Sequence, residues 1–294
     1  MSHAELISGD LVSVYDVTCH APRSGYVISD VTVVTEVVLL RRGAFLIDAG
    51  GKEMFVDVGS ALVLGPHEEY RVAHPGDDGD VFTLLRGAES LVEEALGSVR
   101  GSARRLVPRQ SLVVGLFTNS LRSACWDQLE AEEVALLLLA SIGDAFRGPE
   151  SSSEGSLPKL RSSRVDRTRA LLASAPASPW RLANIAREVG CSPFHLARDF
   201  RRVTGETIGT YLLRLRRGIA IDRMAGGEDD LASLAVESGF SHHSHFTSRF
   251  HRVFGLTPSI ARSAMSRPRV DDLRSLLSPQ PSNNRYAGAR VTAL

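Results

Sequence analysis

Two clusters of basic, imidazole and hydroxyl side chains, each spaced as on one face of a helix, are the groups best suited to binding chemistry. The first cluster lies in residues 193–204 and holds His195, Arg198, Arg201 and Arg202. The second lies in residues 243–254 and holds His243, Ser244, His245, Ser248, Arg249 and Arg252. Guanidinium groups bind phosphates and the guanine edge through paired hydrogen bonds. These residue types therefore indicate contact with nucleic acid.

The same two segments carry apolar residues on the opposite helical face. These residues have i, i+4 spacing, which places them together on one side of a helix. They are Leu196 with Phe200, and Phe246 with Phe250. The pattern predicts two amphipathic helices, each with an apolar face toward a core and a basic face toward solvent or a ligand.

The net charge of zero is unevenly distributed along the chain. Residues 1–159 hold 13 Lys and Arg against 23 Asp and Glu, which gives −10. Residues 160–265 hold 16 Arg, no Lys and 9 acidic residues, which gives +7, and residues 266–294 give +3 from 5 Arg and 2 Asp. A basic segment built from arginine suits phosphate binding. A solvated helical face would also account for charge alone.

An internal repeat surrounds the two clusters. Residues that precede the first cluster recur as the same type 49 positions later. Residues within and just after the first cluster recur 50 positions later. The pairs are Leu182 and Leu231, Ala186 and Ala235, Gly190 and Gly239, Phe200 and Phe250, Gly205 and Gly255, and Thr207 and Thr257. One extra residue at the start of the later helix of the second unit accounts for the change in spacing.

Each repeat has the residues that a helix-turn-helix needs. Ala186 and Ala235 let a second helix approach closely, and a glycine four residues later permits a left-handed turn. Ser192 and Ser241 are predicted N-caps, and Pro193 fits the first helical position. Two such units in one register predict paired DNA-binding helices. A duplicated helical bundle without a DNA role is the alternative, and the arginine-rich faces disfavour it.

The remaining pattern predicts an α+β chain of two domains. Strands are expected at Val31–Leu40, Ala44–Asp48, Glu53–Val58, Ala61–Leu64, Tyr70–Val72 and Val81–Leu85, with a hairpin turn at residues 49–52. Helices are expected at Leu112–Cys125 and from a capping box at Asp127–Glu130 to Phe146. In the basic half, seven helices are expected, the first from Ser163 to Ala175. We assign residues 1–146 to the first domain, 147–162 to a linker, 163–265 to the DNA-binding domain and 266–294 to a flexible tail.

The basic half resembles the DNA-binding domain of the AraC/XylS family of regulators. The matching segments are LANIAREVGCSPFHLARDFRRVTGETIGTYL and LASLAVESGFSHHSHFTSRFHRVFGLTPSIAR. The resemblance covers residues 164–262 and implies a sequence-specific regulator, more commonly an activator, that contacts double-stranded DNA and RNA polymerase. It also implies that two recognition helices enter adjacent major grooves, about 34 Å apart.

The resemblance assigns DNA-facing roles to residues by their position. Those from the first unit are Phe194, Ala197, Arg198 and Arg201, and those from the second are His243, Ser244, His245 and Ser248. Arg198 is expected to read guanine, and phosphate contacts are expected from Arg201, Arg202, Arg249 and Arg252. The chain departs from the family at Ala197, where many members have a longer polar residue, and at Ser248, where arginine is common.

The N-terminal half resembles the cupin-like sensor domains of such regulators. The segment that suggests this is LLRRGAFLIDAGGKEMFVDVGSALVLGPHEEYRVAHPGDDGD. The resemblance implies a β-barrel with helices that holds a small-molecule effector, and a homodimer through the helix Leu129–Phe146. The alternative for that helix is that its apolar residues pack on their own barrel.

No catalytic, metal or cofactor site is predicted. His67, Glu68, Glu69 and His74 lack the spacing of a metal-binding cupin, and a packed Cys19 is favoured over a reactive thiol beside His20. Asp77, Asp78 and Asp80 lie in a glycine-rich turn that needs no catalytic role. The alternative function is a metal-dependent cupin enzyme fused to a DNA-binding module.

The sequence predicts a cytoplasmic protein. Cys19, Cys125 and Cys191 are far apart and odd in number, which suits a reducing compartment. The first residues lack the basic and apolar regions of a signal peptide, and no apolar run is long enough to cross a membrane.

Overall fold

Strands of the acidic half form two antiparallel sheets. The structure is a computed structural model that describes residues 2–26, 28–77, 79–99, 101–106, 108–122, 126–147 and 159–266. One sheet has the order β1 (Ser2–Ser8), β2 (Val12–Cys19), β9 (Asp80–Gly87), β4 (Thr35–Arg42), β7 (Ser60–Leu64) and β10 (Ser102–Arg105). The other has the order β3 (Ile28–Val31), β8 (Glu69–Ala73), β5 (Ala44–Ala49) and β6 (Lys52–Asp57). The predicted α+β class is confirmed at this level.

Strand β4 shows why the six-stranded sheet is buried on both faces. Val37 and Leu39 join the core that contains the neighbouring helices, while Val38 and Leu40 join the core between the two sheets. Successive side chains of a strand point to opposite faces of the sheet. A continuous run of apolar residues therefore packs into both cores. The predicted hairpin is confirmed, because Ala49 pairs with Lys52 across Gly50 and Gly51.

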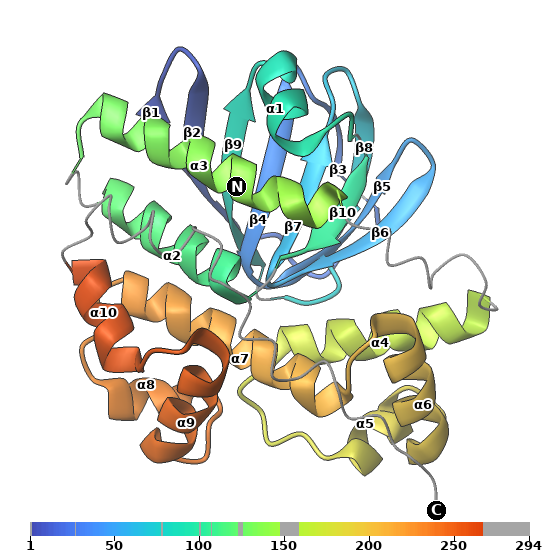
Figure 1. Cartoon of the computed structure of the whole chain (residues 1–294). Helices are drawn as coiled ribbons and strands as arrows, with labels where there is room; N and C mark the ends of the chain where they lie inside the picture. The colour runs from blue at the N-terminus through green and yellow to red at the C-terminus, as the bar shows by residue number, and fades with distance from the viewer. Residues whose placement is uncertain are drawn as a thin grey trace, which may run out of the picture.

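Three helices accompany the six-stranded sheet. They are α1 (Glu89–Leu96), α2 (Pro108–Arg122) and α3 (Gln128–Arg147), and α2 and α3 lie along its outer side (Figure 1). The capping box before α3 is confirmed, since the Glu130 amide donates to the Asp127 carboxylate and the Asp127 amide donates to Glu130. These reciprocal bonds satisfy amide groups that the first helical turn leaves unpaired.

The structure corrects several predicted elements of this half. Residues 31–40 do not form one strand, because β3 ends at Val31 and β4 begins at Thr35. Strands β1 and β10 and helix α1 were not predicted. Most apolar side chains of α3, including Val134, Leu138 and Ile142, are buried within the chain. Packing within the chain, which was the alternative for this helix, therefore explains most of the apolar side chains that were predicted to form a dimer surface.

The basic half contains the seven predicted helices within the described residues. They are α4 (Lys159–Ser174), α5 (Leu182–Glu188), α6 (Pro193–Thr204), α7 (Ile208–Ala225), α8 (Leu231–Glu237), α9 (His243–Phe254) and α10 (Pro258–Ser266). Helix α4 begins four residues before the predicted start at Ser163. Residues 148–158 of the predicted linker and 267–294 of the predicted tail lie outside the described part of the chain.

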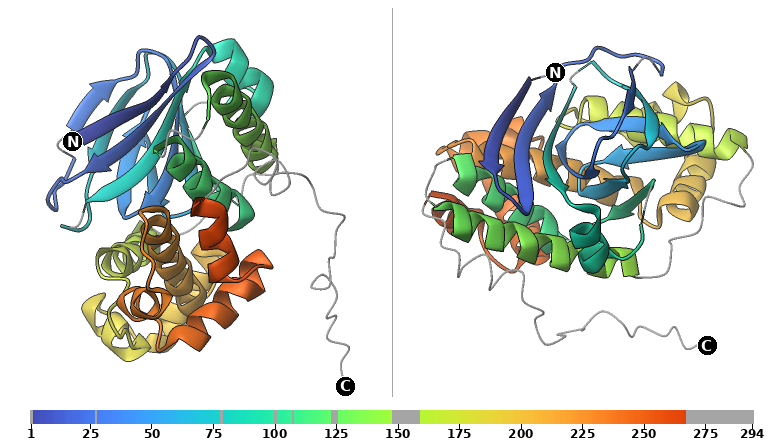
Figure 2. Two further views of the ribbon diagram at one scale, coloured as in Figure 1. Left: turned by 90° about the vertical axis from the view of Figure 1, so that its left-hand side faces the viewer. Right: turned by 90° about the horizontal axis from the view of Figure 1, so that it is seen from above.

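Helix α7 packs directly against the N-terminal sheets. A Cβ atom on Gly218 of this helix would lie 2.3 Å from Val58 Cγ1 and 3.1 Å from the Arg41 carbonyl oxygen. Only glycine permits so close an approach of a helix to a strand. Figures 1 and 2 show α7 running beneath the ends of the strands, with α4 beside it. The two halves are therefore in contact along α7.

Among the helices that the structure describes, none combines the length and the apolar character that crossing a bilayer requires.

Candidate nucleic-acid interface

The first helix-turn-helix is formed by α5 and α6. Ile185 and Ala186 of α5 are buried, and the Cys191 amide donates to the Ala186 carbonyl at 3.0 Å. Gly190 has φ +69°, which a residue with a Cβ atom rarely adopts. Ser192 then caps α6 by accepting a hydrogen bond from the His195 amide at 3.2 Å. The predicted turn, cap and helix start are all confirmed for this unit.

Helix α6 divides into a core face and a solvent face. Its buried residues are Leu196, Asp199, Phe200 and Val203. Phe200 meets Tyr211 of α7 edge-on, with ring centroids 5.3 Å apart, which fixes the rotation of α6 about its axis. Because the core face is fixed in this way, the residues on the other side of α6 point to solvent.

All six residues predicted to contact DNA from the first unit are exposed. They are Phe194, His195, Ala197, Arg198, Arg201 and Arg202. Phe194 is 72% exposed, which is unusual for a large apolar side chain. The Arg198 guanidinium lies 5.9 Å from the Phe194 ring centroid and 3.7 Å from Asp199. The Arg198 side chain is 54% exposed and its ion pair with Asp199 is long, so its guanidinium is accessible to a ligand.

The second helix-turn-helix is formed by α8 and α9 and corrects one predicted cap. Gly239 turns with φ +90°, in the position equivalent to Gly190. His242, not Ser241, is the N-cap of α9, and its Nδ1 atom accepts the His245 amide at 3.1 Å. Ser241 instead contacts His245 Nδ1 at 3.0 Å. The cap moves by one residue because this unit has one more residue before its second helix.

The predicted contact residues of α9 fall into two groups. His243, Ser244, Ser248 and Arg252 are exposed, whereas His245 and Arg249 are half-buried. Arg249 Nε donates to His245 Nε2 at 3.2 Å. Burial, followed by the charge of Arg249, lowers the pKa of His245. Both ring nitrogens of His245 are thus engaged within the protein, and the exposed group forms the solvent face of α9.

The two recognition helices lie at opposite ends of α7. Figure 1 shows α6 and α9 on the side of α7 that faces away from the sheets. Phe246, Phe250 and Phe254 of α9 are buried, as Leu196 and Phe200 of α6 are. The repeated apolar pattern therefore orients both basic faces outward, which sequence spacing alone had indicated.

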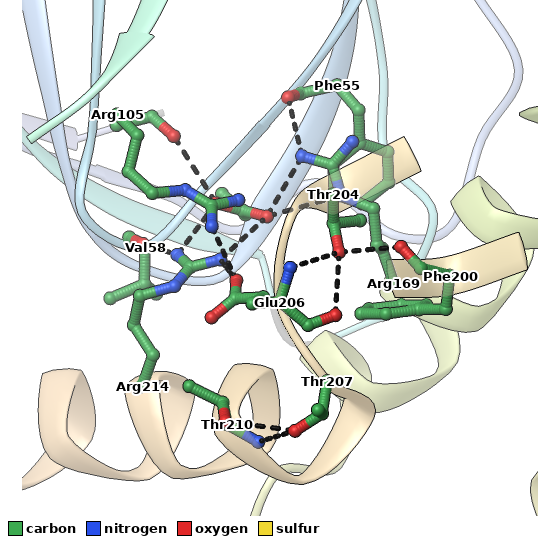
Figure 3. A network of polar contacts seen from close by, with 12 residues as sticks. Phe55, Val58, Arg105, Arg169, Phe200, Thr204, Glu206, Thr207, Thr210 and Arg214 are labelled. Carbon is green, nitrogen blue, oxygen red and sulfur yellow. Dashed lines mark hydrogen bonds and ion pairs between the residues drawn. The ribbon is translucent and has the colours of Figure 1, made fainter. Parts of the chain in front are cut away.

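Asp57 lies at the junction of the sheets and the helical half. It is fully buried and accepts hydrogen bonds from Arg169 Nη2 at 3.0 Å and Arg214 Nη1 at 2.9 Å. Burial alone would raise the pKa of Asp57, but the charges of Arg214, Arg169 and Arg105 outweigh it and hold this pKa well below its usual range. Figure 3 shows Arg105, Arg169 and Arg214 converging, with Glu206 between them. No local pattern in the sequence indicates this cluster, since its members are 48 to 157 residues away from Asp57.

Comparison with known proteins agrees with this geometry. A family model described as a helix-turn-helix domain matches residues 185–264. The chain is 30% identical over 237 residues to the thermoregulatory protein LcrF of Yersinia pestis, which covers 77% of this chain and 79% of LcrF. It is also 30% identical over 240 residues to the virulence regulon transcriptional activator VirF of Yersinia enterocolitica, which covers 77% and 79%.

Solved structures also align with the chain. ToxT from Vibrio cholerae O395 aligns over 87% of this chain and 97% of its own, with 14% identity and a TM-score of 0.34. A regulator from Chromobacterium violaceum, described as having an AraC-type DNA-binding domain, aligns over 37% of this chain and 96% of its own, with 25% identity and a TM-score of 0.35.

Proposed function

This chain belongs to the AraC family of DNA-binding transcriptional regulators, and we propose that it activates transcription by placing α6 and α9 in adjacent major grooves. The observation that carries this proposal is the pair of exposed faces on α6 and α9, each fixed by buried aromatic residues on the opposite side. A recognition helix reads bases through side chains that project from such a face.

Within this proposal, the exposed residues divide by the kind of contact that they make. Arg198 reads a guanine edge, because it projects from the first half of α6 and is 54% exposed despite its 3.7 Å contact with Asp199. Arg201, Arg202 and Arg252 bind phosphates, while His243, Ser244 and Ser248 face the bases of the second groove. Phe194 and Ala197 supply apolar contacts to the bases. His245 and Arg249 are the remaining residues predicted to contact DNA. They are hydrogen-bonded to each other and support the α9 surface.

Selection of bound DNA from a random pool by the full chain tests this proposal. The expected motif has two blocks about one helical turn apart. Arg198→Ala is expected to lose a base preference in one block and to weaken binding to the selected site by about 1–3 kcal/mol. Arg187→Ala is the matched control, because it removes an exposed arginine of α5 without touching the α6 face. Salt-sensitive binding without any motif would contradict sequence-specific reading.

We further propose that the sheets form a cupin-like barrel that holds a small-molecule effector. Supporting this is a cavity of about 530 Å³ lined by residues of both sheets. Its walls combine apolar side chains such as Val38, Ile47 and Leu62 with the polar Tyr70 and Arg86. Mixed apolar and polar linings of this size suit small organic ligands. A thermal-shift screen in which no compound alters the melting temperature would count against the effector.

We also propose that the protein acts in the cytoplasm and that it regulates transcription through contact with RNA polymerase. We propose domain boundaries at residues 1–146, 147–162, 163–265 and 266–294, with the first turn of α4 extending into the linker. Transcription from a promoter carrying the selected site is expected to rise when the protein is added to RNA polymerase. A fall in transcript would show repression instead.

The outer side of α3 remains the proposed homodimer surface. Leu129 is 75% exposed, and Leu136 and Leu137 are half-buried. Sedimentation of the wild type and of Leu129→Asp at equal concentration tests this surface. A dimer that the substitution leaves intact would move the interface elsewhere.

A further inference from the structure

Three buried side chains with metal-binding atoms meet in the N-terminal half. Cys19 is the last residue of β2, Asp80 is the first residue of β9, and the two are direct partners in the antiparallel pair. His74 follows β8 of the other sheet. The exposed fractions are 6% for Cys19, 3% for His74 and 2% for Asp80. The fold thus brings together residues that are up to 61 positions apart in sequence.

A single nitrogen atom of His74 contacts both other residues. His74 Nε2 lies 3.5 Å from Cys19 Sγ and 3.0 Å from Asp80 Oδ2. The sulfur, nitrogen and oxygen atoms all lie within 4.8 Å of one another. A cysteine–histidine–aspartate catalytic triad would use the two ring nitrogens for different partners. Here the three atoms instead converge on one point.

His74 Nε2 is shared between two partners. One ring nitrogen carries at most one proton, so it cannot donate a full hydrogen bond to both the sulfur and the carboxylate. Apart from its 3.0 Å contact with His74 Nε2, the buried Asp80 Oδ2 atom has no hydrogen-bond partner among the described residues. A buried sulfur and a buried carboxylate oxygen that share one donor are costly, and a cation bound between them would compensate both.

We propose that Cys19, His74 and Asp80 bind a divalent transition-metal ion of the Zn²⁺ type. Thiolate, imidazole and carboxylate are the ligands that such ions take. Tetrahedral Zn²⁺ with bonds of about 2.0–2.3 Å holds its ligand atoms about 3.3–3.7 Å apart. The sulfur–nitrogen separation of 3.5 Å agrees with this value, and the nitrogen–oxygen separation of 3.0 Å is slightly shorter.

The surrounding backbone holds the three ligands in place. A Cβ atom on Gly79, which has φ +67°, would lie 1.9 Å from the Cys19 carbonyl oxygen. Glycine at this position therefore lets β9 begin directly against the end of β2. The His74 carbonyl accepts a hydrogen bond from the Ser24 amide at 2.9 Å. These contacts preorganise the ligands, as a metal site requires.

The fourth coordination position faces the cavity between the sheets. Cys19, His74 and Asp80 all line the cavity of about 530 Å³. His74 also lines the cleft that separates the sheets from α4. The chain supplies three ligands, and water or a small molecule in the cavity supplies the fourth, as in open zinc sites. The metal site does not depend on the proposed effector or on DNA binding.

Titration of the metal-free full chain with Co²⁺ under reducing conditions tests the site. We expect one Co²⁺ per chain, with the ligand-to-metal charge-transfer absorption that a cobalt–thiolate bond produces. This absorption should disappear when Zn²⁺ is added and displaces the Co²⁺. Cys19→Ser should abolish this absorption. Asp80→Asn should weaken the affinity for Co²⁺. The loss should exceed the roughly 10- to 100-fold that is typical when a residue that only hydrogen-bonds to a ligand is removed.

Matched controls use the other two thiols of the chain. Cys191→Ser and Cys125→Ser should leave the absorption unchanged. Absorption that survives Cys19→Ser, or that disappears with Cys191→Ser, would overturn the assignment. The absence of stoichiometric Co²⁺ or Zn²⁺ binding by the folded wild type would also overturn it.

A second measurement uses only the wild type, in case a variant fails to fold. X-ray absorption of the Zn²⁺-loaded chain should show one sulfur at about 2.3 Å and the remaining ligands as nitrogen or oxygen at about 2.0–2.2 Å. A shell without sulfur would exclude Cys19 as a ligand and overturn the site.

Discussion

Asp57 at the end of β6 is paired with Arg214 of α7 across the junction between the sheets and the helical half. The two side chains lie 2.9 Å apart, with Asp57 0% and Arg214 14% exposed. Arg169 of α4 pairs with the other carboxylate oxygen at 3.0 Å. Because α7 connects the two helix-turn-helix units, this carboxylate links the cavity-containing half to the helix that positions both recognition helices. A change in the sheets that displaces β6 would therefore act directly on α7.

Asp57→Asn is expected to destabilise the protein strongly. The substitution leaves Arg169 and Arg214 buried without their common counter-charge, and breaking one partner of a buried ion pair costs about 3–5 kcal/mol. Denaturant unfolding of the full chain measures this loss. Asp229→Asn is the control, because Asp229 is 90% exposed in its pair with Arg262, and such pairs contribute at most about 1 kcal/mol. Equal effects of the two substitutions would contradict a special role for Asp57.

The stabilising effect of Asp57 should disappear in acid. Its pKa is depressed in the folded chain, so the stabilisation is complete above the unfolded pKa of about 3.9 and decreases as the pH falls toward the folded value. At pH 3 the unfolded chain has taken up a proton at this site, while the folded chain has not. The stability difference between wild type and Asp57→Asn should therefore be about 1 kcal/mol smaller at pH 3 than at pH 7. A constant or growing difference would mean that the pKa is not depressed.

The solvent faces of the recognition helices predict a defined salt dependence of DNA binding. Each arginine that neutralises a phosphate contributes about −0.9 to the slope of log K against log salt concentration. Arg201→Ala and Arg202→Ala should each make the slope less steep by about that amount. Arg23→Ala, which removes an exposed arginine of the N-terminal half, should leave it unchanged. Equal slopes for all three variants would remove Arg201 and Arg202 from the phosphate contacts.

The sequence was most informative where a pattern was repeated. Glycines, caps and aromatic residues at fixed intervals predicted both helix-turn-helix units and the outward direction of their basic faces. The prediction of Ser241 as the N-cap of α9 was wrong. Ser241 and His242 can both accept an amide hydrogen bond, and only the backbone conformation decides which one does. Strand β1 was missed because its residues are mostly exposed, so they lack the apolar alternation that marks a half-buried strand.

Long-range contacts could not be predicted from spacing. In the sequence Cys19 is next to His20 and Asp80 lies in a glycine-rich segment, yet the β2–β9 register places Cys19 opposite Asp80. Likewise, nothing near Asp57 in sequence indicates that arginines of α4 and α7 will surround it. Both clusters depend on strand pairing and domain packing, which a single sequence does not encode in local periodicity.

Two glycines of α7 provide a test of the packing between the halves of the chain. Alanine is a better helix former than glycine by about 1 kcal/mol, so Gly209→Ala, whose added Cβ atom would meet nothing closer than 4.0 Å, should be neutral or stabilising. Gly218→Ala places its Cβ atom 2.3 Å from Val58 Cγ1 and 3.1 Å from the Arg41 carbonyl oxygen. Overpacking of this kind typically costs about 1–3 kcal/mol, which exceeds the gain in helix propensity.

Gly218→Ala should therefore lower the free energy of unfolding while Gly209→Ala does not, and denaturant titration of both variants measures the difference. The substituted α7 must either shift away from Val58 or force β4 to move, and either change alters the Asp57–Arg214 distance. Increased proteolysis of Gly218→Ala between the two halves would be the accompanying sign. If both alanines stabilise equally, α7 is not pressed against the sheets in solution, and the coupling between the cavity and the recognition helices would need another route.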